Sequence, residues 1–286
     1  MNTKAYILLF LVAMMTGKAF AKKDTVSIEK AFNNKLIKLD IKGHGGYQGP
    51  CIGMQIKSQF NDSMVVYIEA GRRLDSKDST QQDILVVQDL FVSLSSMQQK
   101  NVDVTGYCCQ AHNHAPAAKS VFYVGMLADK NLYDLGQYLN SAKKLNSSSI
   151  QNAIWSISDN NELSSVTDDG TEEVGKLRKF LSKLKGIEVP WYNIFYKKDK
   201  NALFSGKPDK VTGTIEYYIS DFSQVVVNIR DMKGAIVKSF PVGNQVERGN
   251  HTFNLNWDAS LATKGDYVLF LYENGRKLKQ LPIRLQ

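Results

Sequence analysis

Apolar and polar residues alternate along much of the chain after residue 36, which is the pattern of half-buried β-strands. Residues 52–56 and 65–68 predict two strands separated by a turn at 61–63. Residues 84–94 form a near-continuous apolar run, which indicates a buried strand, with a helix as the alternative. Residues 121–127 predict another strand, so the first half of the chain is expected to be rich in β-structure.

The strand expected before residue 109 has two different faces. Val102, Val104 and Cys108 fall on one face at period two, whereas Tyr107 and Cys109 fall on the other. We therefore expect Cys108 to point into the core and Cys109 to point outward or toward a second layer.

Three helices are expected after the strands. Asp129 is suited to cap the first helix, which carries three leucines at helical spacing, and Thr171 is suited to start the third. In the second helix, which includes Ser148, four apolar residues recur at i, i+3, i+4 and i+7: Ile150, Ala153, Ile154 and Ile157. Strands followed by helices are typical of an α+β domain, here with strands arranged as in a β-sandwich.

The last part of the chain reads as all-β. A polar stretch at 197–210 predicts a linker, and about seven short strands follow in roughly eighty residues, as in an immunoglobulin-like sandwich. Asn274-Gly275 is a strong signal for a tight hairpin. The expected organisation is a signal peptide at 1–21, an α+β domain at 22–200 and an Ig-like sandwich at 208–286.

The first residues have the features of an export signal. Lys4 precedes an apolar run, and Ala19-Phe20-Ala21 forms a small-x-small cleavage site, so we expect a secreted, periplasmic or cell-surface protein. Removing Lys4 and Lys18 lowers the formal net charge from +8 to +6. The remaining basic residues are dispersed and no nucleic-acid motif accompanies them, so neither a nucleic-acid partner nor a membrane span is expected.

Three cysteines are an odd number for an exported protein, so one thiol is left after a single bridge forms. A bond between the adjacent Cys108 and Cys109 would be strained, because they point to opposite sides of a strand. A bridge from Cys51 to one of the two is the more plausible pairing.

Gln151 has two interpretations. Ser148-Ser149-Ile150-Gln151 fits a capping box, in which the glutamine side chain bonds only the backbone of Ser148. Gln151 also lies one helical turn before Trp155, so the two share a face at the edge of the apolar stripe.

Residues 106–159 resemble the thioester domains of bacterial surface adhesins. The resemblance rests on a cysteine after an aromatic residue, Tyr107-Cys108, and on Ile150-Gln151-Asn152-Ala153-Ile154-Trp155, which has the family's apolar-Gln-x-apolar-apolar-Trp pattern. It implies that the sulfur of Cys108 joins the side chain of Gln151 with loss of ammonia, and that Trp155 shields the bond.

The same resemblance implies a non-enzymatic, cofactor-free role in adhesion. An amine on a protein or glycan surface of the partner would open the bond and leave a covalent attachment. With Cys108 bonded to Gln151, the remaining cysteines, Cys51 and Cys109, would form the disulfide. Cys109 stands where the family has a generic apolar residue and Cys51 is a further candidate, so the identity of the reacting cysteine stays open.

The C-terminal strands resemble the Ig-like domain of flagellar hook-capping proteins. The matching residues are Val227-Asn228-Ile229-Arg230-Asp231, Gly234, Asn256-Trp257-Asp258 and Gly265-Asp266-Tyr267. This resemblance implies a role in spacing, docking or export. The alternative for the whole chain is a non-covalent binding or structural envelope module that is stabilised by a disulfide, with Gln151 acting only as a cap.

A metal site is the weaker alternative for the residues around Cys109. Cys109, His112 and His114 carry the thiolate and imidazole groups that suit zinc or copper, but no fourth ligand is evident, so no metal site is predicted.

Overall fold

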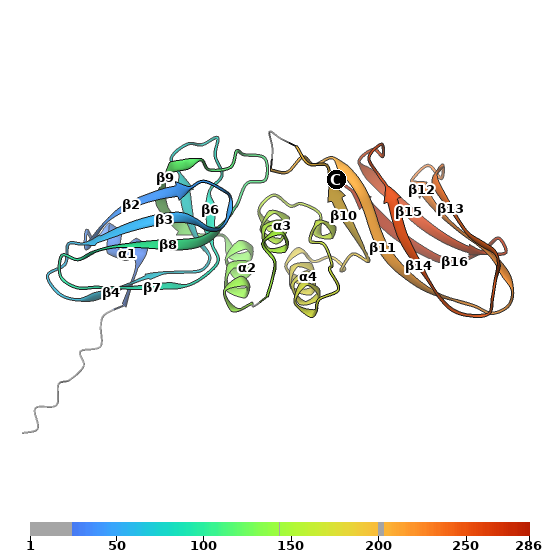
Figure 1. Cartoon of the computed structure of the whole chain (residues 1–286), viewed down its shortest axis with the longest axis horizontal. Coiled ribbons are helices and arrows are strands. Elements are labelled where there is room, and N and C mark those ends of the chain that lie inside the picture. The colour runs from blue at the N-terminus through green and yellow to red at the C-terminus, as the bar shows by residue number, and fades with distance from the viewer. Residues whose placement is uncertain (1–24, 143, 200–202) are drawn as a thin grey trace, which may run out of the picture.

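The computed structural model describes residues 25–142, 144–199 and 203–286, so the expected signal peptide at 1–21 lies outside the described residues. The molecule is elongated, with a β-barrel at one end, a layer of helices in the middle and a pair of β-sheets at the other end (Figure 1). The prediction of a β-rich chain with helices in its middle part is confirmed.

The N-terminal strands close into a barrel and are not arranged as in a sandwich. The barrel follows the order β2-β3-β8-β6-β5-β9. Its strands are β2 (Ile37–His44), β3 (Gln48–Ser58), β5 (Arg72–Ser76), β6 (Ile84–Val86), β8 (Gln99–Cys108) and β9 (Ala118–Leu127). A three-stranded sheet, β1 (Thr25–Ser27), β4 (Met64–Ile68) and β7 (Leu90–Leu94), and the short helix α1 (Ile28–Asn33) complete this part.

The apolar run at 84–94 forms two strands that belong to different sheets. β6 pairs with β5 and β8 in the barrel, whereas β7 pairs with β4. Asp89 separates them, and its carboxylate accepts hydrogen bonds from the Tyr67 hydroxyl at 2.9 Å, the Ala70 N–H at 2.8 Å and Asn140 Nδ2 at 2.9 Å. Asp89 is half-buried, and its carboxylate is fully hydrogen-bonded at the point where the chain changes sheets.

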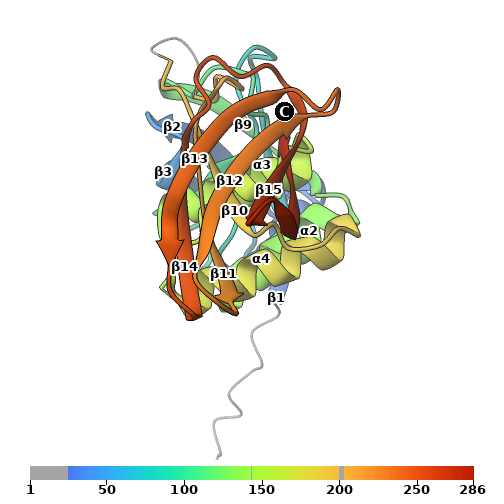
Figure 2. The same ribbon diagram turned by 90° about the vertical axis from the view of Figure 1, so that its right-hand side faces the viewer.

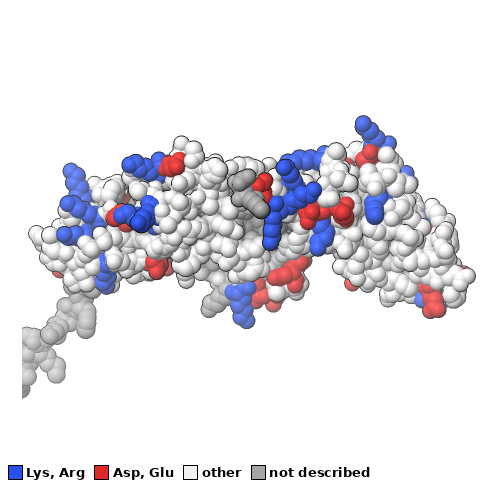
Figure 3. Space-filling view, turned by 45° about the horizontal axis from the view of Figure 1, so that its top comes forward, with Lys and Arg blue, Asp and Glu red and all other residues white. Residues whose placement is uncertain are grey.

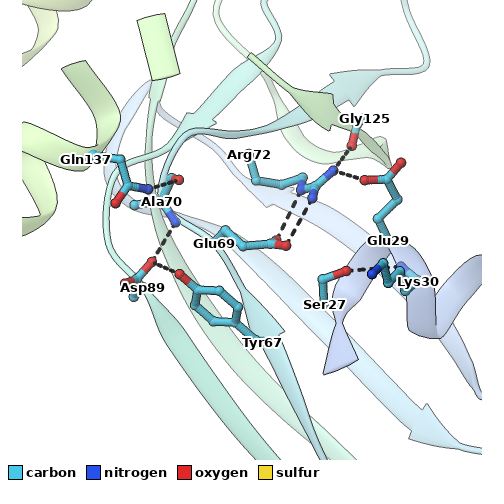
Figure 4. A network of polar contacts seen from close by, with 10 residues as sticks. All are labelled: Ser27, Glu29, Lys30, Tyr67, Glu69, Ala70, Arg72, Asp89, Gly125 and Gln137. Atoms are coloured by element: carbon cyan, nitrogen blue, oxygen red, sulfur yellow. Dashed lines mark hydrogen bonds and ion pairs between the residues drawn. The ribbon is translucent and has the colours of Figure 1, made fainter. Parts of the chain in front are cut away.

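A buried arginine ties the barrel to α1 (Figure 4). Arg72 is 1% exposed and donates to both carboxylate oxygens of Glu69, to Glu29 at 2.6 Å and to the Gly125 carbonyl at 2.9 Å. A buried cation is tolerated because its donors are paired with carboxylates and a carbonyl. Arg72 therefore holds Glu29, Glu69 and the backbone of Gly125 at one point.

Three α-helices and a short 3-10 helix lie between the barrel and the C-terminal sheets: α2 (Lys130–Ser141), α3 (Ser147–Ser158), η1 (Leu163–Ser165) and α4 (Glu172–Lys185). The predicted caps Asp129 and Thr171 are confirmed, because their side chains accept from the N–H groups of Leu132 and Val174. The apolar stripes of the helices form a second core with the outward face of the barrel strands.

Seven strands of the described chain form two facing sheets around a third core. One sheet is ordered β10-β11-β14 and the other β13-β12-β15-β16. The strands are β10 (Tyr192–Tyr196), β11 (Pro208–Ile219), β12 (Ser223–Asp231), β13 (Ile236–Val246), β14 (Gly249–Asp258), β15 (Gly265–Glu273) and β16 (Arg276–Leu285). Figure 2 views this end along the long axis. The predicted hairpin at Asn274-Gly275 is confirmed, with positive φ at both residues.

The segment at 190–196 joins the C-terminal sheets, because residues 192–196 form β10, which pairs with β11. Arg178 of α4, 1% exposed, also reaches this segment. Its guanidinium donates to the carbonyls of Pro190 and Tyr192 and to Asn193 Oδ1. The helices and the C-terminal sheets are thus joined through one buried side chain.

No helix in the described part of the chain is long and apolar enough to cross a membrane. On the face drawn in Figure 3, basic and acidic side chains lie in small separate patches on a mostly uncharged surface.

Candidate functional site

The end of β8 brings Cys108 to the boundary between the barrel and the helices. Cys108 lies opposite Ile84 of β6, and its N–H donates to the Tyr47 carbonyl at 3.1 Å. Its side chain is fully buried in the barrel core, whereas Tyr107 and Cys109 belong to the core shared with the helices. The predicted alternation of faces is therefore confirmed.

Gln151 of α3 contacts the same residue through both ends of its carboxamide. The N–H of Cys108 donates to Gln151 Oε1 at 3.2 Å, and Gln151 Nε2 donates to the Cys108 carbonyl at 2.8 Å. Gln151 is 2% exposed, so both bonds are formed away from water. The carboxamide thus pairs with the backbone of Cys108 as a neighbouring strand would.

The capping interpretation of Gln151 is wrong. The N-cap of α3 is Asn146, whose Oδ1 accepts from the Ser149 N–H at 2.7 Å. Ser148 lies inside the helix, and the side chain of Gln151 turns to β8 instead of the first turn.

The three cysteines are unpaired and buried, so the expected Cys51–Cys109 disulfide is not present. Its physical obstacle is that the two residues face different cores: Cys51 lies with Cys108 inside the barrel, and Cys109 lies with the helices outside it. Burial raises the pKa of the Cys51 thiol to about 11 and raises the pKa values of Cys108 and Cys109 as well. All three are therefore protonated thiols near neutral pH.

Trp155 lies one helical turn after Gln151, as expected, and is 4% exposed. Its indole N–H donates to Gln82 Oε1 at 3.4 Å, and its ring centroid is 6.0 Å from that of Phe204. Trp155 thus closes the space between α3 and the segments around residues 82 and 204, which keeps this end of α3 dry.

A network of amide side chains surrounds the end of β8, and no pattern in the sequence singles it out. Gln82 is fully buried; its Oε1 also accepts from the Gln110 N–H, and its Nε2 donates to the Asn113 carbonyl. Gln110 in turn exchanges two 2.6 Å hydrogen bonds with Asp83. These contacts fix the chain on both sides of Cys108 and Cys109, so the backbone that Gln151 contacts is held in place.

At this site the Cys108 thiol and the Gln151 carboxamide are both buried, and the N–H of Cys108 donates a hydrogen bond to the carboxamide oxygen. Among the described residues, no three or more His, Cys, Asp or Glu side chains are grouped as a metal ion would require, and His112 and His114 lie in the loop after Gln110. Cys108 and Gln151 themselves supply a thiol and a carboxamide, which are a nucleophile and an acyl group.

Comparisons with known proteins identify no family for this chain. No family model matches, and no match was found among curated proteins. Among solved structures, the transglutaminase of red sea bream is aligned with a TM-score of 0.21 and 7% identity, over 90% of this chain and 32% of that chain. The chain thus spans about a third of the length of that enzyme, and a likeness at this score bears on neither fold nor function.

Proposed function

We propose that this protein is an exported adhesin-like protein in which Cys108 and Gln151 form an internal thioester that reacts with amines on a partner surface. The observation that carries the proposal is the pair of hydrogen bonds between the Gln151 carboxamide and the backbone of Cys108. The motif resemblance pointed to Cys108 and Gln151, which lie 43 residues apart in the sequence, and the fold brings them into contact.

The contact favours attack by the sulfur of Cys108 rather than that of another cysteine. The N–H and C=O of Cys108 both bond Gln151, and Sγ is two bonds from the Cα of this residue; because the side chain lies in the barrel core, the proposed step requires the thiol to turn toward Cδ of Gln151. Cys109 points into the other core, and Cys51 lies on β3. Proximity of this kind replaces a bimolecular encounter by an intramolecular step.

The forming step exchanges ammonia for sulfur. The S–C bond forms at Cδ of Gln151, the C–N bond breaks, and the thiol proton leaves with the amide nitrogen as ammonia. Negative charge that develops on Oε1 during the attack faces the N–H of Cys108 at 3.2 Å, an arrangement like an oxyanion hole. Because burial keeps the thiol protonated, the step is expected to be slow, which a bond made once per molecule tolerates.

The reacting step transfers the acyl group to the partner. A primary amine attacks Cδ, the C–S bond breaks, the sulfur regains a proton, and an amide joins Gln151 to the partner. Burial of Gln151 and Trp155 excludes water, so hydrolysis does not compete while the site is closed. The partner class is an amine-bearing protein or glycan surface, and the C-terminal sheets are proposed as an Ig-like domain that spaces or docks the reactive domain.

Intact mass spectrometry of the protein purified from its export compartment tests the proposal. The expected mass is one ammonia below that of the mature sequence, and methylamine should raise it by one methylamine and release one thiol. Cys108→Ala and Gln151→Ala should each abolish the deficit, whereas Cys51→Ala is the matched control and should retain it.

A full mass with three titratable thiols in the native protein would contradict the proposal. The hydrogen bonds of Gln151 would then serve only to fasten α3 to β8, and the non-covalent binding module would be the remaining proposal.

A further inference from the structure

Three segments meet at the end of the barrel farthest from the helices (Figure 1). They are residues 32–38, which lead from α1 into β2, residues 57–63, which lead from β3 into β4, and residues 95–100, which lead from β7 into β8. The Gln59 N–H donates to the Leu36 carbonyl at 2.8 Å. The Ser58 N–H donates to the Gln98 carbonyl, also at 2.8 Å. The three segments therefore form one surface, which we call the barrel tip.

Each segment of the barrel tip exposes a large apolar side chain. Phe32, Phe60 and Met97 are 46%, 41% and 55% exposed. Met97 lies in a turn with a φ of 57°, a backbone conformation that favours glycine or asparagine, so the turn itself does not call for methionine. Single exposed apolar residues are ordinary on a protein surface, but three in adjoining segments mark a surface that contacts something apolar.

A shallow groove beside Phe32 extends this surface. Its volume is about 570 Å³, and it is lined by Phe32, Asn33, Lys35, Ile37, Lys38, Leu39 and Gln59. Apolar and basic side chains thus border the same hollow.

The barrel tip is basic as well as apolar. Its charged residues are four lysines and one aspartate: Lys35, Lys38, Lys57, Lys100 and Asp62. No carboxylate of the described residues pairs with any of the four, since the lysines in ion pairs lie elsewhere. At the left end of the molecule in Figure 3, blue side chains accordingly have little red beside them.

Two of these lysines are placed where they repel each other. Lys38 of β2 lies directly opposite Lys57 of β3, and both are exposed. Like charges directly opposite each other on neighbouring strands destabilise a sheet. An anion bound between them would relieve this cost, so the pair indicates a negatively charged partner.

We infer that the barrel tip docks on a bilayer surface rich in anionic phospholipids. The three apolar side chains would enter the boundary between headgroups and acyl chains, and the lysines would bind the headgroup phosphates. A second copy of the chain would place lysines against lysines, and a water-soluble polyanion would leave the apolar side chains in water. An anionic bilayer surface matches both properties of the tip without any segment spanning the membrane.

Co-sedimentation with vesicles tests the inference, using the mature protein that begins at Lys22. One set of vesicles contains phosphatidylglycerol and phosphatidylcholine in equal parts, and the other contains phosphatidylcholine alone. The protein is expected to bind the first set at least about tenfold more tightly, and the difference should shrink as salt is added, because ions screen the lysines. Equal binding to the two sets, or no binding to either, would overturn the inference.

Membrane docking does not depend on the thioester. Neither lipid carries a primary amine, so the proposed reaction of Gln151 plays no part in the assay. Cys108→Ala should bind the vesicles as the unaltered protein does. A failure of docking and a failure of the proposed function are therefore distinguishable.

Charge variants assign the binding to the barrel tip. Replacing Lys35, Lys38 and Lys57 by glutamine should weaken binding to the phosphatidylglycerol vesicles by about fivefold for each lysine. The matched control replaces three exposed lysines elsewhere, Lys179, Lys183 and Lys233, and should weaken it far less. An equal loss in the two triple variants would show that overall charge, and not the tip, binds the lipid, and would overturn the inference.

Apolar variants test insertion. Phe60→Ser/Met97→Asn should weaken binding by about tenfold or more, because two side chains no longer leave water for the bilayer. Phe222→Ser/Met232→Asn is the matched control, since it changes the same residue types at exposed positions of the C-terminal sheets. Unchanged binding of the Phe60→Ser/Met97→Asn protein would show that the tip attracts polyanions by charge alone, and would overturn docking on a bilayer.

Discussion

Replacing Gln151 by methionine removes both hydrogen bonds to Cys108 while it keeps most of the side-chain volume. The N–H of Cys108 keeps its hydrogen bond to the Tyr47 carbonyl at 3.1 Å, so losing the bond to Gln151 costs about 1 kcal/mol of stability or less. The Cys108 carbonyl loses the donor at 2.8 Å in a buried place, which costs about 1–3 kcal/mol. Gln151→Met is therefore expected to lower the free energy of unfolding by about 1–4 kcal/mol.

Urea denaturation of the Cys108→Ala and Cys108→Ala/Gln151→Met proteins measures this difference. The alanine background removes any thioester, yet the hydrogen bonds persist in it because they involve the backbone of residue 108. Gln137→Met is the matched control: Gln137 Nε2 donates a single hydrogen bond to the Ala70 carbonyl at 2.8 Å, so its loss should cost about 1 kcal/mol. A Gln151→Met cost no larger than the Gln137→Met cost would refute the pairing of Gln151 with β8.

Three other outcomes test the fold and the thiols. In a thermal unfolding assay, Gly136→Ala should destabilise the protein although alanine favours helices, because the new Cβ would lie 2.8 Å from the backbone of Gly71. The matched Gly175→Ala has open space around it and should stabilise the protein by up to about 1 kcal/mol in the same assay. Arg178→Met should cost about 3 kcal/mol or more in urea denaturation, because several buried carbonyls lose their donor, and a neutral effect would contradict the role of Arg178 as a fastener. Since iodoacetamide reacts with thiolates, the raised pKa values predict slow alkylation at pH 8 that accelerates as the pH approaches 11, the value for Cys51; alkylation of the native protein as fast as in urea would contradict this.

Features that depend on local chemistry were predictable from the sequence. Asp129 and Thr171 cap their helices because a short oxygen-bearing side chain accepts from the third residue of the helix. The N-cap of α3 was misjudged because Asn146 and the three serines after it can all act as caps, so the local signal does not fix the first residue.

Features that depend on strand pairing were not predictable in the same way. Alternation shows that Cys108 and Cys109 face opposite sides of β8, but it does not show which side a residue on β3 faces. Cys51 lies within an irregularity of the β3–β8 register between Gly49 and Ile52, and its side chain faces the barrel core. The disulfide prediction failed because it depended on this non-local register.

The contact between Cys108 and Gln151 was predicted from the motif, but its form was not. The motif predicts the sulfur near the carboxamide, whereas in the structure the carboxamide bonds the backbone N–H and carbonyl of Cys108. The amide network of Gln82 and Gln110 escaped notice because neither residue stands in a periodic or charged pattern, although both fix the backbone at this point.

The hydrogen bonds of Gln151 also predict how the proposed thioester favours amines over water once it is opened. Loss of ammonia removes Nε2, so the Cys108 carbonyl loses the donor now at 2.8 Å. Attack by a primary amine restores one N–H at that nitrogen position, whereas hydrolysis leaves a carboxylate that cannot donate at neutral pH. The methylamine-opened protein is therefore expected to be more stable toward urea than the Gln151→Glu protein by about 1–3 kcal/mol. Equal stability of the two would show that the restored N–H does not reach the Cys108 carbonyl, and that the contact seen between α3 and β8 does not survive the reaction.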